Sequence, residues 1–290
     1  MLAIIGGSKS WEFLSSGRLR GERLGPCPTP YGPSQPVHRL ELGGQAALFL
    51  PRHGEQGYHV SAPFVNYRAN VYALKEYGAS RIVAWSGPGA ISPALGVGQF
   101  VVPDDILDET RRRPCTFFEG AGYGFLRQSP VFCPELSGGL AAALRELGLP
   151  FAASGTYVCT EGPRLETPAE IRKYAALGGH LVGMTLCPEV FLARELEMCY
   201  AALCYVTNHA EGVEPSAPEP GRLFGGLASE AELQAQADAA ARIPDVLEML
   251  SARADALPQR CTCGSSMLRY KTRGSVGSDW HTWIRYDTES

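Results

Sequence analysis

Short apolar runs alternate along the chain with longer stretches that have helical spacing. Apolar runs of this length, bounded by turn residues, are typical of buried strands, and helices between them indicate crossover connections. The pattern therefore predicts a single α/β fold with a mixed, mostly parallel sheet flanked by helices. The expected strands cover residues 2–5, 46–50, 82–85, 100–102, 156–158, 181–184 and 200–206.

Two helices are predicted from apolar spacing and glycine stops. The first covers 65–77, with Ala69 and Tyr72 on one face and Gly78 at its end, and the second covers 134–147. Apolar residues that recur every three or four positions share one helix face, and glycine commonly ends a helix.

Capping boxes mark the starts of two further helices, at Thr167 and at Ser229. Each hydroxyl residue is followed three positions later by a glutamate, the reciprocal pattern that satisfies the first free N–H groups of a helix. Pro244 lies within the last long helix and is expected to kink or split it.

Composition excludes several function classes. The 290 residues carry a net charge of −4, and the hydrophobic content is 45%. These values predict no nucleic-acid partner, and no apolar run is long enough to predict a membrane span. The N-terminus enters a strand without a basic leader, so we expect no signal peptide and a cytoplasmic location.

The nine cysteines are expected to be reduced thiols, most of them buried. They are Cys27, Cys115, Cys133, Cys159, Cys187, Cys199, Cys204, Cys261 and Cys263. Cys261 and Cys263 form the only close pair, and one such pair without a second is a weak zinc signal. Two ordinary loop cysteines and no metal are therefore favoured, and a disulfide remains an alternative if the source is thermophilic.

Two segments near the C-terminus are expected to be irregular: a loop before the last long helix and a tail after it. A Pro- and Gly-rich stretch over 212–226 predicts a mobile loop. Residues 1–255 are expected to form the domain, and residues 256–290 a polar, poorly ordered tail that carries the cysteine pair. A partner-binding extension is an alternative for this tail.

Groups that can bind an anion follow three predicted strands. Ser8 follows the Gly-Gly turn after the strand expected at 2–5. Arg52 and His53 follow the strand expected at 46–50, and Ser86 and Gly87 follow the strand expected at 82–85. Hydroxyl, guanidinium and turn N–H groups all donate hydrogen bonds to phosphate. Because ligands of α/β folds bind at the carboxyl ends of strands, these turns are expected to form one phosphate site.

The ordered set of short motifs over about residues 1–250 resembles the trimeric purine nucleoside phosphorylase family. The branch it resembles contains the 5′-methylthioadenosine and 5′-methylthioinosine phosphorylases. The motifs are Gly6-Gly7-Ser8, Thr29-Pro30-Tyr31-Gly32, Arg52-His53-Gly54, Asn66-Tyr67-Arg68, Arg113-Pro114, Glu161-Gly162-Pro163-Arg164 and Met184-Thr185. The resemblance implies a homotrimer, or a dimer of trimers, that acts on a purine nucleoside and phosphate without a cofactor.

The resemblance also implies roles for matching residues. Phosphate would be bound by Ser8, Arg52, His53, Ser86, Gly87 and Thr185. Met184 would lie under the ribose, Leu165 takes the position of a base-stacking residue, and Phe125 would be lent to the sugar pocket of a neighbouring subunit.

Glu166 and Asn208 would read the base and stabilise it as it leaves. An amide can donate to O6 or N7 of a 6-oxopurine, and a carboxylate can accept its N1–H. Adenine would instead present an amino donor to the amide. A mispaired polar edge in a buried site costs a few kcal/mol, so the pair favours hypoxanthine or guanine.

The expected reaction is phosphorolysis of the N-glycosidic bond, giving the free base and a ribose 1-phosphate or methylthioribose 1-phosphate, in purine salvage. Methylthioinosine is favoured by resemblance, with inosine and guanosine as close competitors. The alternatives are a 5′-methylthioadenosine phosphorylase, a phosphate-independent nucleosidase, and a nucleoside-binding protein without turnover.

Overall fold

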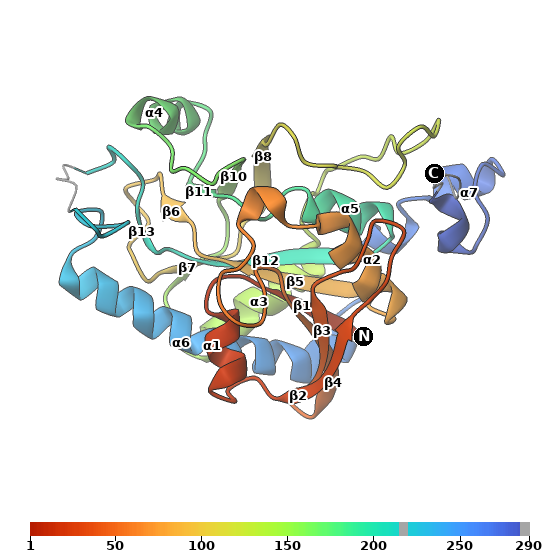
Figure 1. Cartoon of the computed structure of the whole chain (residues 1–290), viewed down its shortest axis with the longest axis horizontal. Coiled ribbons are helices and arrows are strands. Elements are labelled where there is room, and N and C mark those ends of the chain that lie inside the picture. Colours follow the sequence, from red (N-terminus) through yellow and green to blue (C-terminus); the bar gives the residue numbers. More distant parts are fainter. Residues whose placement is uncertain (215–219, 285–290) are drawn as a thin grey trace.

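An eight-stranded sheet forms the centre of the molecule (Figure 1). The computed structural model describes residues 1–214 and 220–284. The sheet has the order β2-β3-β4-β1-β5-β12-β7-β9. β4, β1, β5 and β12 are mutually parallel, whereas β2, β3 and β4 form an antiparallel meander and β7 lies antiparallel to β12. The bounds are β1 (Leu2–Gly6), β2 (Gly21–Pro26), β3 (Pro36–Leu42), β4 (Gln45–Pro51), β5 (Arg81–Ser86), β7 (Phe100–Val101), β9 (Phe151–Ala152) and β12 (Cys199–Tyr205).

A second, five-stranded sheet has the order β13-β6-β11-β10-β8. Its strands are β6 (Gly89–Ala90), β8 (Asp105–Glu109), β10 (Thr156–Thr160), β11 (Leu181–Gly183) and β13 (Asn208–His209). β5 and β12 of the first sheet lead directly into β6 and β13 of the second. The two sheets therefore meet at the carboxyl ends of the central strands.

Side-chain alternation along the central strands explains why the first sheet is covered on both faces. In β1, Ala3 and Ile5 join one core cluster with α2 and α5, whereas Leu2 and Ile4 join another with α3 and α6. Successive strand residues point to opposite faces, so an unbroken apolar run needs cover on both sides. The helices are α1 (Ser10–Ser15), α2 (Tyr67–Glu76), α3 (Pro134–Glu146), α4 (Pro168–Ala176), α5 (Glu189–Glu195), α6 (Glu230–Arg253) and α7 (Leu268–Thr272).

The predicted α/β architecture is confirmed, and each predicted strand is present within a residue or two of its expected bounds. Both capping boxes are formed, at Thr167 of α4 and at Ser229 of α6. Pro244 was expected to kink or split the last helix, and the split is contradicted because α6 continues as one helix through Pro244. Pro244 is buried on the face that packs on α3 and the sheet, and this packing outweighs the lost backbone hydrogen bond.

The Pro- and Gly-rich stretch over 212–226 contains residues 215–219, which lie outside the described residues. The flanking residues 212–214 and 220–226 form turns. No helix in the described part of the chain has both the length and the apolar composition needed to cross a bilayer.

The segment after residue 256 differs from the expected poorly packed tail. It forms short helical turns, with α7 among them, and it buries Met267, Tyr270 and Trp283 against the core cluster of α2 and α5. The scattered aromatic residues of this segment supply enough apolar surface to fix it, although they lack helical or strand periodicity.

Candidate active site

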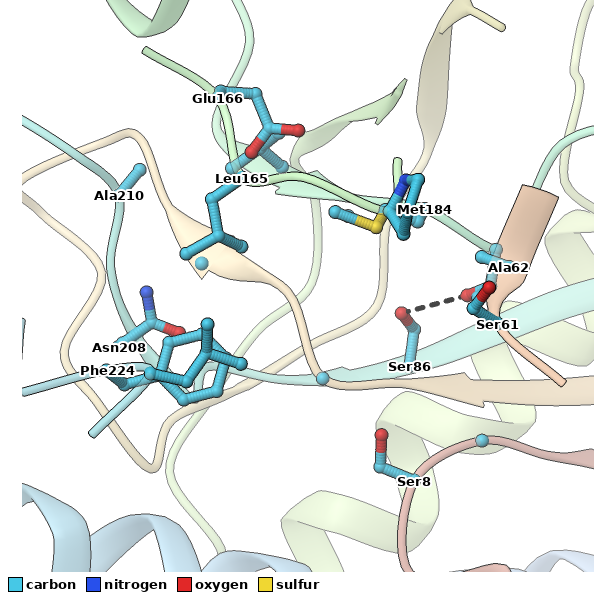
Figure 2. A pocket seen from close by; sticks show the side chains of 18 of the residues that line it. Ser8, Ser61, Ala62, Ser86, Leu165, Glu166, Met184, Asn208, Ala210 and Phe224 are labelled. Atoms are coloured by element: carbon cyan, nitrogen blue, oxygen red, sulfur yellow. Dashed lines mark hydrogen bonds between the residues drawn. The ribbon is translucent and has the colours of Figure 1, made fainter. Parts of the chain in front are cut away.

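A cavity of ≈ 370 Å³ opens where the two sheets meet, at the carboxyl ends of β1, β4, β5 and β11 (Figure 2). Most of the residues that the sequence singled out line it. The lining includes Gly7, Ser8, His53, Ser86, Gly87, Pro163, Leu165, Glu166, Met184, Thr185, Asn208, Leu223, Phe224 and Leu227. Arg52 and Phe125 do not line it. In Figure 2, Ser8 and Ser86 lie at one end of the cavity and Asn208 at the other.

Hydroxyl groups gather at the end of the cavity that holds Ser8. Ser86 Oγ lies 3.2 Å from Thr185 Oγ1 and 3.0 Å from the Tyr157 hydroxyl. Ser86 and Thr185 are buried, with 6% and 7% of their surface exposed. Rotatable hydroxyls can turn their hydrogens toward an anion, so this end suits phosphate.

Trp85 fixes the turn that carries Ser8. The Trp85 indole N–H donates to the Ser8 carbonyl at 2.9 Å, and its ring stacks on Phe49. The Trp85 carbonyl lies so close to Gly7 that a β-carbon there would be 2.6 Å away. Gly7 is therefore required by close packing, and Trp85 sets the position of the turn.

His53 is held as a neutral imidazole beside the hydroxyl cluster. Its Nδ1 donates to the Val60 carbonyl at 2.8 Å, which leaves Nε2 as an acceptor, and its ring stacks on Tyr58 at 4.0 Å between centroids. Burial is the main reason that the pKa of His53 falls to about 3, and the Arg52 charge contributes to the decrease. A neutral Nε2 can accept a hydrogen bond from a protonated phosphate oxygen.

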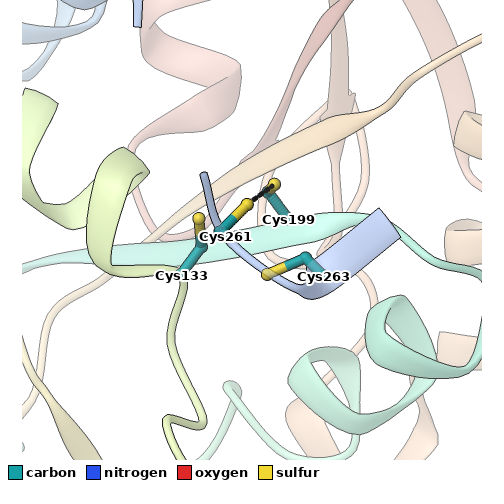
Figure 3. A group of neighbouring side chains, drawn as sticks. All are labelled: Cys133, Cys199, Cys261 and Cys263. Atoms are coloured by element: carbon teal, nitrogen blue, oxygen red, sulfur yellow. Dashed lines mark hydrogen bonds between the residues drawn. The ribbon is translucent and has the colours of Figure 1, made fainter. Parts of the chain in front are cut away.

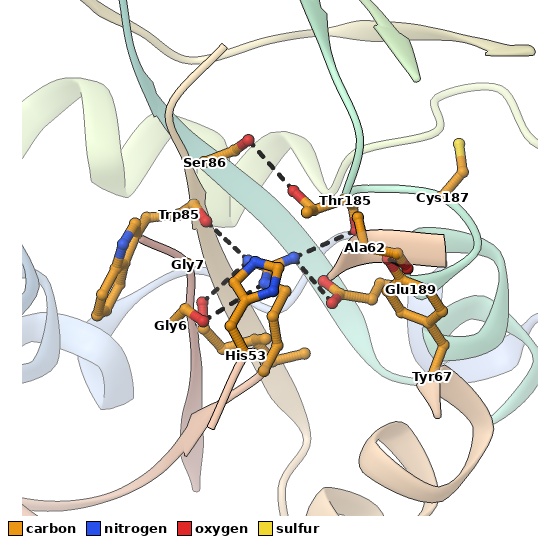
Figure 4. A network of polar contacts seen from close by, with 12 residues as sticks. Gly6, Gly7, His53, Ala62, Tyr67, Trp85, Ser86, Thr185, Cys187 and Glu189 are labelled. Atoms are coloured by element: carbon orange, nitrogen blue, oxygen red, sulfur yellow. Dashed lines mark hydrogen bonds and ion pairs between the residues drawn. The ribbon is translucent and has the colours of Figure 1, made fainter. Parts of the chain in front are cut away.

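Arg52 does not line the cavity, so its predicted contact with phosphate stays a prediction. Its guanidinium is fully buried and donates to Glu189 Oε1 at 2.8 Å, to the Trp85 carbonyl at 2.7 Å, and to the carbonyls of Ile5, Gly6 and Thr185. Figure 4 shows Glu189, Trp85 and Gly6 within this network. Burial raises the pKa of Glu189, whereas the Arg52 charge opposes that rise. Arg52 thus holds together the strand ends and loop that line the hydroxyl-rich end of the cavity.

Asn208 lies at the other end of the cavity and is held by its neighbours along the chain. Its Oδ1 accepts from the Thr207 hydroxyl at 2.7 Å, and its Nδ2 donates to the His209 carbonyl at 2.7 Å. Since a carbonyl only accepts, the NH₂ group must face His209, and among the described residues its second hydrogen has no partner, so it can serve a ligand.

Glu166 lines the cavity at the end that holds Asn208, where its Oε1 accepts from the Thr160 hydroxyl at 2.6 Å. Leu165 and Phe224 are at this end as well (Figure 2). The site therefore offers one carboxylate and one amide between apolar side chains, an arrangement suited to a flat base with polar edges.

Met184 is supported by an arginine whose role the sequence analysis missed. Arg113 is buried and donates to the carbonyls of Met184 and Cys187, both at 2.6 Å, and to those of Thr160 and Glu161. It joins the loop after β10 to the loop after β11. A buried arginine bound to several carbonyls can be recognised only from the structure.

Phe125 does not line the cavity of its own chain and is 81% exposed. The structure contains one chain, so the contribution of Phe125 to a neighbouring subunit stays a prediction. Leu223 and Phe224 were missed because they lie within the stretch predicted as a mobile loop, and Leu227 because it follows that stretch directly. Their apolar character within a Gly-rich segment was the available signal.

The model of the phosphorylase superfamily matches residues 2–250. The 6-oxopurine nucleoside phosphorylase of Pyrococcus furiosus is 45% identical over 219 residues, which cover 73% of this chain and 80% of that protein. The chain belongs to the phosphorylase superfamily. It is a nucleoside phosphorylase, a pentosyltransferase, and the matched region includes both ends of the cavity.

Other relatives of this phosphorylase carry different names. The probable S-methyl-5′-thioinosine phosphorylase of Methanothermobacter thermautotrophicus is 44% identical, with 74% of each chain covered. Among solved structures, methylthioadenosine phosphorylase from Schistosoma mansoni in complex with adenine has a TM-score of 0.78 at 26% identity, with 92% of this chain and 96% of that chain covered. A methylthioadenosine phosphorylase from an antarctic soil metagenomic library has a TM-score of 0.77 at 31% identity, with 91% and 90% covered.

Proposed function

We propose that this phosphorylase cleaves the N-glycosidic bond of 6-oxopurine nucleosides with inorganic phosphate as the nucleophile. The products are hypoxanthine or guanine and the 1-phosphate of ribose or methylthioribose. The observation that carries the proposal is the fixed orientation of the Asn208 amide, whose free N–H faces the same cavity as the Glu166 carboxylate.

The orientation of Asn208 selects against adenine. The NH₂ group is a donor, so it pairs with the N7 or O6 acceptor of a 6-oxopurine and repels the amino group of adenine. An aspartate at this position would place a carboxylate oxygen against the His209 carbonyl, which Nδ2 contacts at 2.7 Å. Glu166 accepts the N1–H that only the 6-oxopurine carries.

The positions of the lining residues suggest how the glycosidic bond is exchanged for a bond to phosphate. Phosphate bound by Ser8, His53, Ser86 and Thr185 attacks C1′ of the sugar as the bond from C1′ to N9 breaks. The electron pair of that bond passes to the purine ring, where Asn208 stabilises the charge at N7 and O6. Phosphate is already anionic, so positioning rather than activation of the nucleophile is required.

A homotrimer is also proposed, in which Phe125 of one subunit completes the sugar pocket of its neighbour. A phenylalanine with 81% of its surface exposed at the end of a loop suits a contact with another subunit. Sedimentation of wild type and Phe125→Ala, together with the KM for nucleoside, tests this point.

The second candidate is 5′-methylthioadenosine phosphorylase, favoured by relatives such as that of Thermofilum pendens, which is 39% identical. Purine release from methylthioinosine, inosine, guanosine and methylthioadenosine, each with and without phosphate, separates the candidates. The proposal expects phosphate-dependent release confined to the three 6-oxopurines. Release that does not depend on phosphate would instead support a nucleosidase, and no release with any substrate would support a binding protein.

A further inference from the structure

Four cysteine sulfurs gather at the amino end of β12, whereas the cavity lies at the carboxyl ends of the central strands (Figure 3). The Sγ atoms of Cys133, Cys199, Cys261 and Cys263 all lie within 4.8 Å of one another, and those of Cys199 and Cys261 are 3.5 Å apart. A tetrahedral zinc ion with bonds of about 2.3 Å to sulfur requires sulfurs about 3.8 Å apart. The four thiols therefore lie close to the separations that a zinc tetrathiolate requires.

The cluster is assembled from three separate parts of the chain. Cys133 is the N-cap of α3, Cys199 begins β12, and Cys261 and Cys263 come from the C-terminal segment. The sequence analysis favoured two ordinary loop cysteines because the chain contains one close pair. The second pair of ligands is contributed by residues far apart in sequence, so ligand spacing could not reveal it.

The surroundings suit a charged metal complex. Cys133 and Cys263 are buried, and Cys199 and Cys261 are half-buried. A zinc ion with four thiolates carries a net charge of −2. Arg194 is buried and directs Nη1 at Cys263 Sγ from 4.0 Å, and the N-terminus of α3 faces Cys133. Both place positive charge beside the sulfurs.

We propose that Cys133, Cys199, Cys261 and Cys263 bind one structural zinc ion. The ion would join the C-terminal segment to α3 and β12, far from the reacting groups. Four protein ligands leave no open coordination position, which is characteristic of a structural rather than a catalytic zinc site.

The proposal gives the C-terminal segment a function. Tyr270 accepts a hydrogen bond from the Phe125 N–H at 2.9 Å, and the Tyr123 hydroxyl donates to the carbonyl of Trp283. The segment held by Cys261 and Cys263 thus supports the loop that presents Phe125. Loss of zinc would loosen this loop as well as the segment itself.

Metal analysis of the full chain, purified with reductant and without chelator, tests the proposal. Elemental analysis by mass spectrometry should find about one zinc per chain. The double variant Cys133→Ser with Cys261→Ser should lose it, whereas Cys115→Ser, which removes an exposed thiol outside the cluster, should retain it. Reduced, metal-free wild type should bind one cobalt(II) ion with the visible bands of a tetrahedral tetrathiolate.

Limited proteolysis supplies a second measurement on wild type alone. Removal of zinc should increase cleavage within residues 257–284, and added zinc should reverse it. The proposal is overturned if the reduced protein binds neither zinc nor cobalt, or if the double variant binds as much as wild type. Disulfides among these four cysteines, in a protein that binds no metal after reduction, would also overturn it.

Discussion

The indole N–H of Trp85 donates to the carbonyl of Ser8 at 2.9 Å and thereby connects the end of β5 to the turn after β1. Trp85 belongs to β5 and Ser8 follows β1, and both of these strands end at the cavity that Ser8 lines. The position of the turn that carries Ser8 thus depends on a side chain that lies within the core.

Trp85→Phe tests this connection. Phenylalanine keeps an aromatic ring against Phe49 but leaves the Ser8 carbonyl without its donor, a loss worth about 1 kcal/mol. We expect the KM for phosphate to rise by about fivefold, while the KM for nucleoside changes little. Steady-state kinetics with each substrate varied in turn measure both. An equal rise in both KM values would show that the substitution loosens the whole site.

Arg52→Met separates a positioning role from direct phosphate binding. It leaves the Glu189 carboxylate buried without its ion pair, which should lower the free energy of unfolding by about 3–5 kcal/mol. Adding Glu189→Leu should restore part of that loss. Denaturant unfolding measures both variants. An Arg52→Met enzyme with wild-type stability and a greatly raised KM for phosphate would show that the guanidinium reaches phosphate itself.

Gly162→Ala tests the close packing over Met184. Gly162 has φ +69°, and a β-carbon there would lie 2.5 Å from Met184 Sδ. We expect Met184 to be displaced and the KM for nucleoside to rise several-fold. Gly178→Ala is the matched control, because Gly178 has φ +83° but open space around it. Both should lose about 1 kcal/mol of stability from backbone strain, and only Gly162→Ala should alter the kinetics.

His53 should make stability depend on pH. Its pKa falls from an ordinary value near 6.5 to about 3 in the folded chain, so the unfolded chain binds the proton first as pH decreases. The stabilisation is complete above pH 6.5 and is lost as pH falls toward 3, by at most about 1.4 kcal/mol per pH unit. Denaturant unfolding of His53→Gln between pH 7 and pH 4 should show a shallower decline than wild type.

The matched control for the pH experiment is His59→Gln, which removes an exposed imidazole close in sequence to His53. It should follow the wild-type decline. If the free energy of unfolding of His53→Gln declines as steeply with falling pH as that of wild type, His53 is not held neutral in the folded protein.

The fold was predictable because its central strands are continuous apolar runs bounded by turns. β2 and β8 were missed, since their side chains are mostly exposed or half-buried and the apolar signal is weak. The strand that contains Pro36 and His38 was missed for a related reason, because a proline at its start and a buried histidine break the apolar pattern.

The cavity lining was predictable where residues lie at the end of a predicted strand or just beyond it, as Ser8, Ser86 and Asn208 do. Arg52 shows the limit of this reasoning. Its position after β4 is correct, but the direction of its guanidinium depends on Glu189, which is distant in sequence and fully buried. Phe224 and the cysteine cluster were missed because tertiary contacts alone bring them together.

The ratio of kcat/KM for methylthioinosine to that for methylthioadenosine tests the central claim most directly. The two substrates share a sugar and differ at the base edge that Asn208 and Glu166 are proposed to read. The account predicts a ratio above about 10², equivalent to roughly 3 kcal/mol of discrimination by a paired buried edge. Asn208→Asp should reduce this ratio. A wild-type enzyme that prefers methylthioadenosine would contradict the proposed base recognition.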